Sequence, residues 1–239
     1  SKCVITKLVF AVLVFTTSAG AKHVFVPEEM IWVKAQDFCR SRYTDLSPVT
    51  NKVEKRVFKK SVSEDQTGWV GLYWDLMDQK WRWSGGADDD REGERDDWMN
   101  IGQSLWWNGT KFRARNLTSS KSFFCLNLIV VQEEKTWEEA LDHCRENHQD
   151  FTSLLSQTEN LLAQNRIQNS SVTQRVWVGL RLLKETWMWA NGDPLEFQNW
   201  NQAGDQNQQC PVRKRCGALT KQGEWENRDC EERLHFICV

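Results

Sequence analysis

Large apolar residues recur in the same order in the two halves of the chain. The run Trp-Val-Gly-Leu stands at residues 69–72 and again at 177–180, and a Trp-x-Trp step follows each run, at 81–83 and at 187–189. Upstream of each run, a tryptophan stands seven residues before a cysteine, and each half closes on two large apolar residues followed by a cysteine. An ordered set of apolar anchors that repeats after about a hundred residues indicates two homologous domains and not a solenoid of short units.

The pattern within each half predicts an opening strand and two helices. In the first half, residues 23–25 have the pattern of a strand and residues 32–42 that of a helix. Asn51 and Glu54 have the spacing of a capping box, which predicts the start of a second helix. The second half repeats this order, with a strand at 128–131 and capping pairs Thr136 with Glu139 and Ser156 with Glu159. Beyond each Trp-Val-Gly-Leu strand the chain turns polar, which predicts a long loop before a final hairpin.

The first stretch has the pattern of a secretory signal peptide. Lys2 and Lys7 precede an apolar run at residues 8–15, and Ala-Gly-Ala at 19–21 offers a cleavage site of small residues. We therefore expect a secreted, extracellular protein. No other segment approaches the roughly 20 apolar residues that a membrane-spanning helix needs. The chain is accordingly divided into a signal peptide and two domains, at residues 1–21, 22–126 and 127–239.

Charge and motifs limit the classes of function. The net charge is −2 and the pI about 6.1, so nothing favours a nucleic-acid partner. The chain has no nucleophile elbow, P-loop or His-Glu-x-x-His sequence, and its four histidines stand at no metal-binding spacing. An acidic run at residues 88–97 lacks the glycine and glutamate offsets of an EF-hand, which favours a solvated loop. These observations predict a recognition protein and not an enzyme.

The cysteines fit an oxidising compartment. Cys3 would leave with the signal peptide, and disulfides are the expected state of most of the remaining cysteines in a secreted protein. Cys210 is left over by the simplest pairing, which suggests either a disulfide-linked dimer or a different pairing in the second domain. That simplest pairing joins Cys39 to Cys125, Cys144 to Cys238 and Cys216 to Cys230.

These features resemble the C-type lectin-like domain, present twice. The resemblance rests on the Trp-Val-Gly-Leu strand, the two-helix opening, the terminal Phe-Ile-Cys and Trp225, which stands five residues before Cys230. Tandem copies are similar to secreted fish-type C-type lectins or to a fragment of the macrophage mannose receptor group. The resemblance implies an α+β fold in which each domain has two helices, a small antiparallel sheet, a long loop region and disulfides.

The second domain departs from the calcium-dependent sugar site of that family. Where the resemblance implies a Glu-Pro-Asn type of triplet, gapless counting back from Cys216 finds Gln206, Asn207 and Gln208. Lys214 stands at a position where the family places a glutamate, and its ammonium group opposes a bound cation. The resemblance therefore implies a degenerate site.

Three oxygen-bearing side chains remain as weak calcium candidates. Glu226 and Asn227 occupy the family's paired positions after the tryptophan, and Asp205 lies in the preceding loop. Calcium takes about six to eight oxygen ligands, more than this set supplies. We therefore expect no firm cofactor and at most a weak calcium ion.

The first domain departs further. Gln103 and Leu117 stand where the family has its inner disulfide, and Phe112 replaces the tryptophan. Acceptor sequons for N-glycans stand at Asn108, Asn116 and Asn169, the first two in this same region. Glycans here would make the first domain a poor sugar receptor, so we expect a spacer or a protein contact.

A basic triplet beside the degenerate site suggests the ligand. Arg213, Lys214 and Arg215 could pair with sulfate, sialate or phosphate groups, and Trp200 offers a ring for stacking on a sugar. One hypothesis is a lectin for anionic glycans, with a role in innate immune recognition; the other is a protein-binding or scaffold module that has lost sugar binding. The candidate ligand loop comprises Trp200, Asp205, Gln206, Gln208, Arg213, Lys214, Arg215, Glu226 and Asn227.

Overall fold

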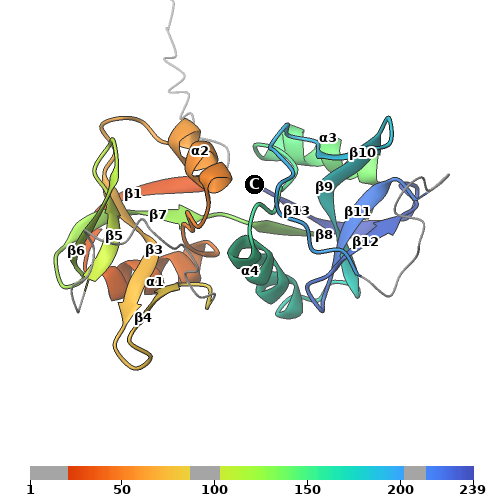
Figure 1. Ribbon diagram of the computed structural model, residues 1–239. Coiled ribbons are helices and arrows are strands. Elements are labelled where there is room, and N and C mark those ends of the chain that lie inside the picture. Colours follow the sequence, from red (N-terminus) through yellow and green to blue (C-terminus); the bar gives the residue numbers. More distant parts are fainter. Residues whose placement is uncertain (1–20, 87–102, 202–213) are drawn as a thin grey trace, which may run out of the picture.

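The computed structural model describes residues 21–86, 103–201 and 214–239, and the two halves of the chain form two separate sheets. Figure 1 shows the halves side by side, joined where β7 (Lys121–Leu126) passes into β8 (Ile129–Lys135). Within the described ranges, no helix is long and apolar enough to cross a membrane. The expected α+β fold with two lectin-like domains is confirmed.

The first sheet follows the order β1-β7-β3-β5-β6, with β2 paired to β7 and β4 paired to β3. Its further elements are β1 (His23–Met30), α1 (Trp32–Arg42), β2 (Asp45–Leu46), α2 (Lys52–Ser61), β3 (Gly68–Asp75), β4 (Lys80–Trp83), β5 (Gln103–Trp107) and β6 (Phe112–Asn116). Phe58 of α2 is fully buried and packs edge-on against Trp107 and Phe124. Aromatic packing under α2 therefore joins that helix to the sheet.

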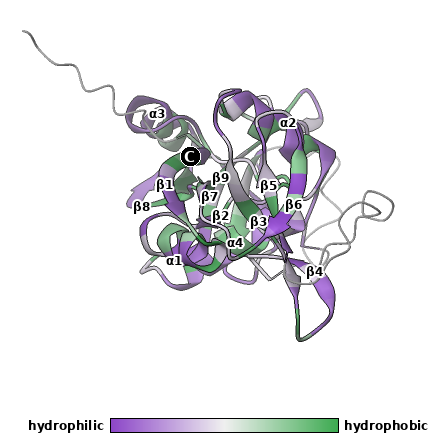
Figure 2. Ribbon diagram, turned by 90° about the vertical axis from the view of Figure 1, so that its left-hand side faces the viewer, coloured by the Kyte–Doolittle hydropathy of each residue, from purple (hydrophilic) through white to green (hydrophobic). Residues whose placement is uncertain are grey.

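The second sheet follows the order β12-β11-β9-β13-β8, with β10 paired to β9. Its elements are α3 (Trp137–Asn147), α4 (Gln157–Gln168), β9 (Arg175–Leu183), β10 (Thr186–Trp189), β11 (Cys216–Thr220), β12 (Trp225–Arg228) and β13 (Leu234–Cys238). Trp189 and Trp225 are both buried, with ring centroids 5.4 Å apart. In Figure 2, hydrophobic segments gather around α4 at the centre of the view, whereas α3 and the β4 hairpin are mainly hydrophilic.

Recurring tryptophans make matching hydrogen bonds in the two domains. The indole of Trp32 donates to the carbonyl of Val70, and that of Trp137 donates to the carbonyl of Val178, both at 2.9 Å. The indoles of Trp69 and Trp177 donate in the same way to the carbonyls of Met30 and Lys135, both at 3.0 Å. At these four positions the buried indole N–H has a backbone acceptor, a bond that phenylalanine or leucine could not make.

The disulfides Cys39–Cys125, Cys144–Cys238 and Cys216–Cys230 are formed, as the simplest pairing predicted. Cys210 lies outside the described residues. The first domain keeps the backbone anchor of its lost inner disulfide: the N–H of Trp32 donates to Leu117 and the N–H of Trp137 to Cys230, both at 3.0 Å. Leu117 therefore occupies the structural place of Cys230.

Most of the predicted elements are found at the expected places. The helix predicted at 32–42 is α1, and the box of Thr136 and Glu139 at the start of α3 is complete. Both opening strands run further than expected, to Met30 and to Lys135. The strand expected to start at Leu128 starts at Ile129 instead, because the N–H of Leu128 bonds to the Thr44 hydroxyl of the other domain at 2.8 Å.

The other two predicted capping boxes are only half formed. Asn51 and Ser156 each accept the expected bond from the backbone of the glutamate three residues on. The Glu159 carboxylate, however, accepts from the N–H of Leu155 at 2.8 Å and not from the N–H of the cap residue. Glu54 likewise bonds to the backbone and hydroxyl of Thr50. Both carboxylates also contact the opposite domain, and this second set of contacts accounts for the difference.

A buried ion pair connects the two domains. The ammonium of Lys22 lies 2.9 Å from the Glu159 carboxylate and 3.0 Å from the carbonyl of Ser153, and both charged side chains are almost inaccessible to solvent. Burial raises the pKa of Glu159 to about 7, although Lys22 opposes this shift. The adjacent His23 is buried against Ser47, and burial together with Lys22 lowers its pKa to about 3.

The starts of α2 and α4 face each other across the same seam. The Asn51 side-chain amide donates to Leu155 at 2.8 Å, and the Ser156 hydroxyl donates to the Glu54 carboxylate at 2.5 Å. Val53 joins the apolar cluster of the second domain, which includes Leu154, Leu155 and Leu162. The domains therefore abut through a buried interface.

Candidate functional site

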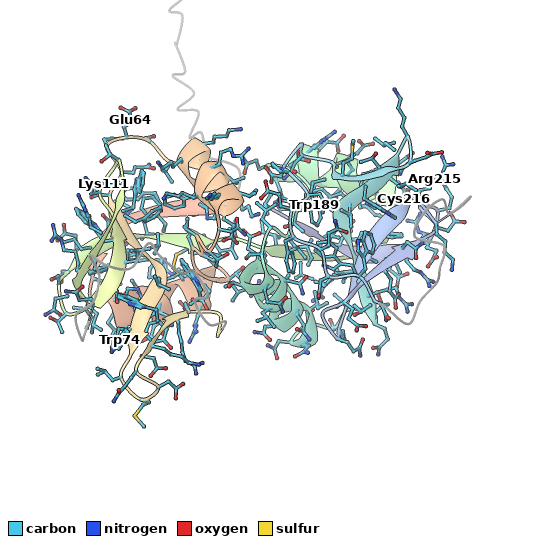
Figure 3. The ribbon with its side chains drawn as sticks, in the orientation of Figure 1. Glu64, Trp74, Lys111, Trp189, Arg215 and Cys216 are labelled. Atoms are coloured by element: carbon cyan, nitrogen blue, oxygen red, sulfur yellow. A yellow bond between two sulfur atoms is a disulfide. The ribbon has the colours of Figure 1, made fainter. Side chains whose placement is uncertain are left out.

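The described part of the predicted ligand face lies at the end of the second domain away from the seam. Figure 3 shows Arg215 and Cys216 at that end. The carbonyl of Arg215 accepts a bond from the N–H of Leu182 at 2.8 Å, so this residue is fixed at the edge of β9, and both Lys214 and Arg215 are exposed. Several of the predicted site residues lie outside the described ranges: Asp205, Gln206, Gln208 and Arg213.

A salt bridge engages the glutamate of the paired calcium positions. The Glu226 carboxylate accepts from the Arg175 guanidinium at 2.8 Å, and both side chains are about a third exposed or less. An arginine in this contact supplies the positive charge that a calcium ion would otherwise supply. The neighbouring Asn227 has its side-chain nitrogen buried, without a partner among the described residues.

The described residues do not fit a calcium ion. One carboxylate is held by an arginine, and Lys214, two residues before β11, is an exposed cation. In the ranges that the structure covers, His, Cys, Asp and Glu side chains form no group of three or more that could hold a metal.

Trp200 is half-buried in an aromatic cluster. Its ring centroid lies 4.7 Å from that of Trp187 and 5.7 Å from that of Trp225, and its indole donates to Gln198 at 2.9 Å. The ring therefore serves the packing of the domain first. The expected role as a surface for sugar stacking is restricted to the part of the ring that solvent reaches.

Arg181 is a cation of this region that the sequence reasoning missed. It stands opposite Cys216 in the β9–β11 pairing, donates to Glu138 at 2.9 Å and lies 4.9 Å above the Trp137 ring. It directly follows the Trp-Val-Gly-Leu run, and this position in the sequence could have identified Arg181 as a candidate site residue. These contacts fix the Arg181 guanidinium close to Cys216, and the salt bridge to Glu138 offsets part of its charge.

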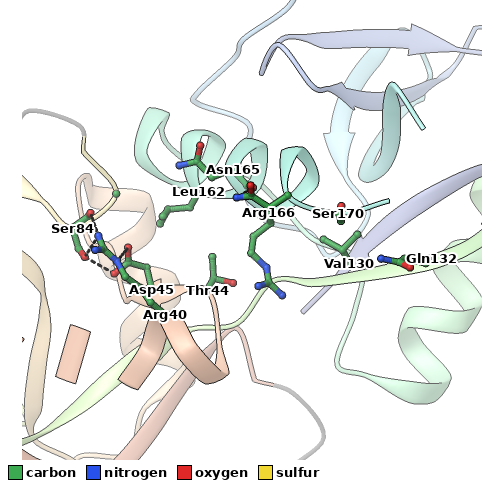
Figure 4. Close-up of a pocket in the computed structure, with 12 residues that line it drawn as sticks. Arg40, Thr44, Asp45, Ser84, Val130, Gln132, Leu162, Asn165, Arg166 and Ser170 are labelled. Atoms are coloured by element: carbon green, nitrogen blue, oxygen red, sulfur yellow. Dashed lines mark hydrogen bonds and ion pairs between the residues drawn. The ribbon is translucent and has the colours of Figure 1, made fainter. Parts of the chain in front are cut away.

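A polar cavity of about 510 Å³ lies at the seam, far from this face. Figure 4 shows its walls, which come from both domains. Arg40 donates to the Asp45 carboxylate at 3.1 Å and to the carbonyl of Ser84 at 2.7 Å. Burial raises the pKa of Asp45, against the opposing effects of Ser84 and Arg40. Arg166 of α4 also lines the cavity, whose rim includes the sequon residue Asn169.

The histidines form no catalytic group among the described residues. His143 is half-buried, with its ring 5.2 Å from that of Phe236 and 5.9 Å from that of His148. Burial lowers the pKa of His148. His235 contacts only the hydroxyl and backbone of Thr173 among the hydrogen bonds of the described residues.

The three sequons are accessible to different degrees. Asn116 and Asn169 are exposed, at the end of β6 and at the end of α4. Asn108 is half-buried in a tight turn, where its side chain accepts from the N–H groups of Thr110 and Lys111. Glycosylation at all three stays a prediction.

Comparisons with known proteins agree with this fold. The Lectin C-type domain model matches residues 28–125 and 133–239. The human secretory phospholipase A2 receptor is 33% identical over 107 residues, which are 43% of this chain and 7% of that protein. Human lymphocyte antigen 75 is 21% identical over 252 residues, which are 87% of this chain and 14% of that protein. The chain thus spans only a small part of these relatives.

Two further similarities each cover about half of this chain. Chicken collectin-10 is 27% identical over 112 residues, which are 46% of this chain and 39% of that protein. The mouse scavenger receptor C-type lectin carbohydrate-recognition domain is 22% identical, with a TM-score of 0.41, over 46% of this chain and 84% of that structure. Because the two family matches together cover most of the sequence, this chain belongs to the C-type lectin domain family, with two copies of the domain.

Proposed function

We propose that this protein is secreted and that its second domain recognises an anionic glycan without calcium. The salt bridge between Glu226 and Arg175 is the observation that carries the proposal. It engages a carboxylate that a calcium lectin would keep for the metal, and it lies in a domain whose ligand face carries Arg215 and Lys214, both exposed. Recognition by the lectin-like domains is non-enzymatic.

The ligand class follows from the groups that remain. A guanidinium forms paired hydrogen bonds with sulfate and carboxylate oxygens, and an ammonium adds a point charge. A neutral hexose offers hydroxyls alone and lacks the charge that these cations would pair with. Sulfated or sialylated chains are therefore favoured over mannose or galactose.

The first domain would bind no sugar through its loop region, and the protein would form dimers. Glycans on Asn108 and Asn116 would cover the loop region of the first domain, which leaves it as a spacer or a protein contact. Cys210 would join two chains in a disulfide-linked dimer and so present two ligand faces. Such a protein suits innate immune recognition of repeated glycans, since paired weak sites gain avidity when both engage one surface.

A protein-binding module is the second candidate function. It is favoured by the hairpin between β3 and β4, where Leu76 is 60% exposed and Met77 is 91% exposed. Large apolar side chains at such a tip are typical of protein contacts. In that case the second domain would have lost sugar binding altogether.

The test compares wild type with a triple variant on immobilised sulfated and sialylated glycans. The variant carries Arg213→Ala, Lys214→Ala and Arg215→Ala. The variant should bind more weakly than wild type. Wild-type binding should also weaken as the salt concentration rises, because charges farther apart than about 8 Å are largely screened at physiological ionic strength. Equal binding by the two proteins to the sialylated glycans, or binding to a neutral sugar that a chelator abolishes, would contradict the proposal.

A further inference from the structure

The solvent face of α2 consists of cations alone. The helix exposes Lys52, Arg56, Lys59 and Lys60, and Lys55 is half-exposed beside them. At 3.6 residues per turn, these five side chains lie within about 140° of one another around the helix axis. The opposite face, which includes Val53 and Phe58, is buried in the protein. Figure 1 shows α2 at the top of the first domain.

Within the described residues, this charge is not neutralised. The five cations take part in none of the ion pairs there. Glu54, the one acidic residue of α2, is buried and bonded to Thr50 and Ser156. Like charges so close together repel one another, which costs stability unless an anion binds there.

Aromatic rings position two of these cations. The ammonium of Lys59 lies 5.4 Å from the centroid of Trp107, and that of Lys55 lies 5.9 Å from the centroid of Phe112. Such contacts are attractive when the cation stands over the ring, so they restrict where these two side chains lie. Both rings are themselves buried by the packing of α2 on the sheet.

The second domain provides an internal comparison. Its helix α4 occupies the same place in the repeat as α2 and exposes Gln157, Asn165, Arg166 and Gln168. One of these four residues is charged. The cationic face is therefore a property of the first domain and not a requirement of the fold.

The observations favour a sulfated polysaccharide as the partner. Lys52, Arg56 and Lys60 are spaced by four residues each, which places them about 6 Å apart along the axis. A linear chain bearing sulfate groups can follow such a row and pair with each cation. A membrane surface fits less well, because an interfacial helix inserts its apolar face into the lipid, and that face of α2 is buried.

A single-stranded nucleic acid also fits less well. Binding of single strands relies on aromatic rings on which bases stack, and Trp107 and Phe112 under α2 are 3% and 8% exposed. We propose that the cationic face of α2 binds a sulfated polysaccharide, at a site separate from the ligand loop of the second domain. This surface gives the first domain a recognition role of its own.

The test measures binding of the full chain to immobilised heparin across a range of salt concentrations. The variant Lys52→Gln, Arg56→Gln, Lys60→Gln spares Lys55 and Lys59, which lie over rings of the sheet, and glutamine keeps a similar helix propensity. The control Lys34→Gln, Lys184→Gln, Lys221→Gln removes the same net charge elsewhere. The α2 variant should bind about ten-fold more weakly or worse, with a shallower salt dependence, while the control stays within about two-fold of wild type.

Three results would overturn the proposal. They are equal heparin binding by wild type and the α2 variant, equal losses in the α2 variant and the control, and wild-type binding to phosphatidylserine vesicles or duplex DNA but not to heparin. Circular dichroism and thermal melting confirm that each variant is folded. The ligand-loop variant Arg213→Ala, Lys214→Ala, Arg215→Ala separates the two proposals: it should keep heparin binding through α2 and lose binding to sialylated glycans, whereas the α2 variant should keep binding to sialylated glycans.

Discussion

Removing the ammonium of Lys22 should weaken the whole two-domain unit. In Lys22→Met, the Glu159 carboxylate loses a partner at 2.9 Å and Ser153 loses two, while the carboxylate stays fully buried near Glu54. Breaking a buried ion pair from one side costs about 3 to 5 kcal/mol of unfolding free energy. We expect a loss of this size at pH 8, because both carboxylates are then ionised in the unfolded chain and water solvates them there.

The loss should be smaller at pH 5.5. The folded-state pKa of Glu159 is about 7, above its ordinary value of 4.5, so this group contributes stability that is full below pH 4.5 and declines as the pH rises through 7. Without Lys22 that pKa rises further, and at pH 5.5 Glu159 is protonated and needs no counter-charge. At pH 5.5 the variant therefore loses only the hydrogen bonds of Lys22, which lowers the unfolding free energy by about 1 to 3 kcal/mol.

Urea unfolding followed by tryptophan fluorescence measures both values. The control is Lys34→Met, because Lys34 forms an ion pair with Asp37 in which both side chains are more than half exposed. That control should lose less than about 0.5 kcal/mol. Adding Glu159→Gln to Lys22→Met should recover part of the stability at pH 8. A loss below about 1 kcal/mol at pH 8, or equal losses at the two pH values, would refute the account of the seam.

Three further predictions concern the metal and the cysteines. Millimolar calcium should raise the melting temperature little compared with a chelator, since a ligand stabilises only as far as it occupies the native state; a shift of many degrees would contradict this. Cys216→Ser with Cys230→Ser opens a loop of fourteen residues and should cost about 3 kcal/mol, measured by urea unfolding, while an unchanged midpoint would show that the bond is not formed. A dimer on non-reducing gels should disappear in Cys210→Ser, and a monomeric wild type would exclude the interchain bond.

The repeated pattern of apolar residues was sufficient to predict the fold. The recurring tryptophans make the same contacts in both domains: the indoles of Trp32 and Trp137 each donate to a carbonyl of the strand that carries the Trp-Val-Gly-Leu run. The same spacing of tryptophans in the two halves therefore indicated the same structure. The cysteine pairing followed for the same reason, because each outer disulfide joins an early helix to a late strand in both domains.

The contacts between the domains could not be predicted in this way. The sequence predicted Glu54 and Glu159 as capping residues, and their backbone N–H groups do bond to the cap side chains. Their carboxylates, however, also bond to Ser156 and Lys22, which lie more than a hundred positions away in the sequence. The same limit applies to the candidate site. Arg175 and Glu226 are 51 residues apart, and only the pairing of β9, β11 and β12 brings them together. From the sequence Glu226 was a weak calcium candidate, and its salt bridge to Arg175 could not be foreseen.

A glycan array run first with calcium and then with a chelator tests the central claim most directly. The array should contain sulfated, sialylated and neutral chains, and the protein should be the full chain at low and at physiological salt. The account predicts binding to sulfated or sialylated chains that the chelator leaves unchanged and that salt weakens. Binding to mannose or galactose that the chelator abolishes would contradict it, because Arg175 would then have to release Glu226 to a calcium ion.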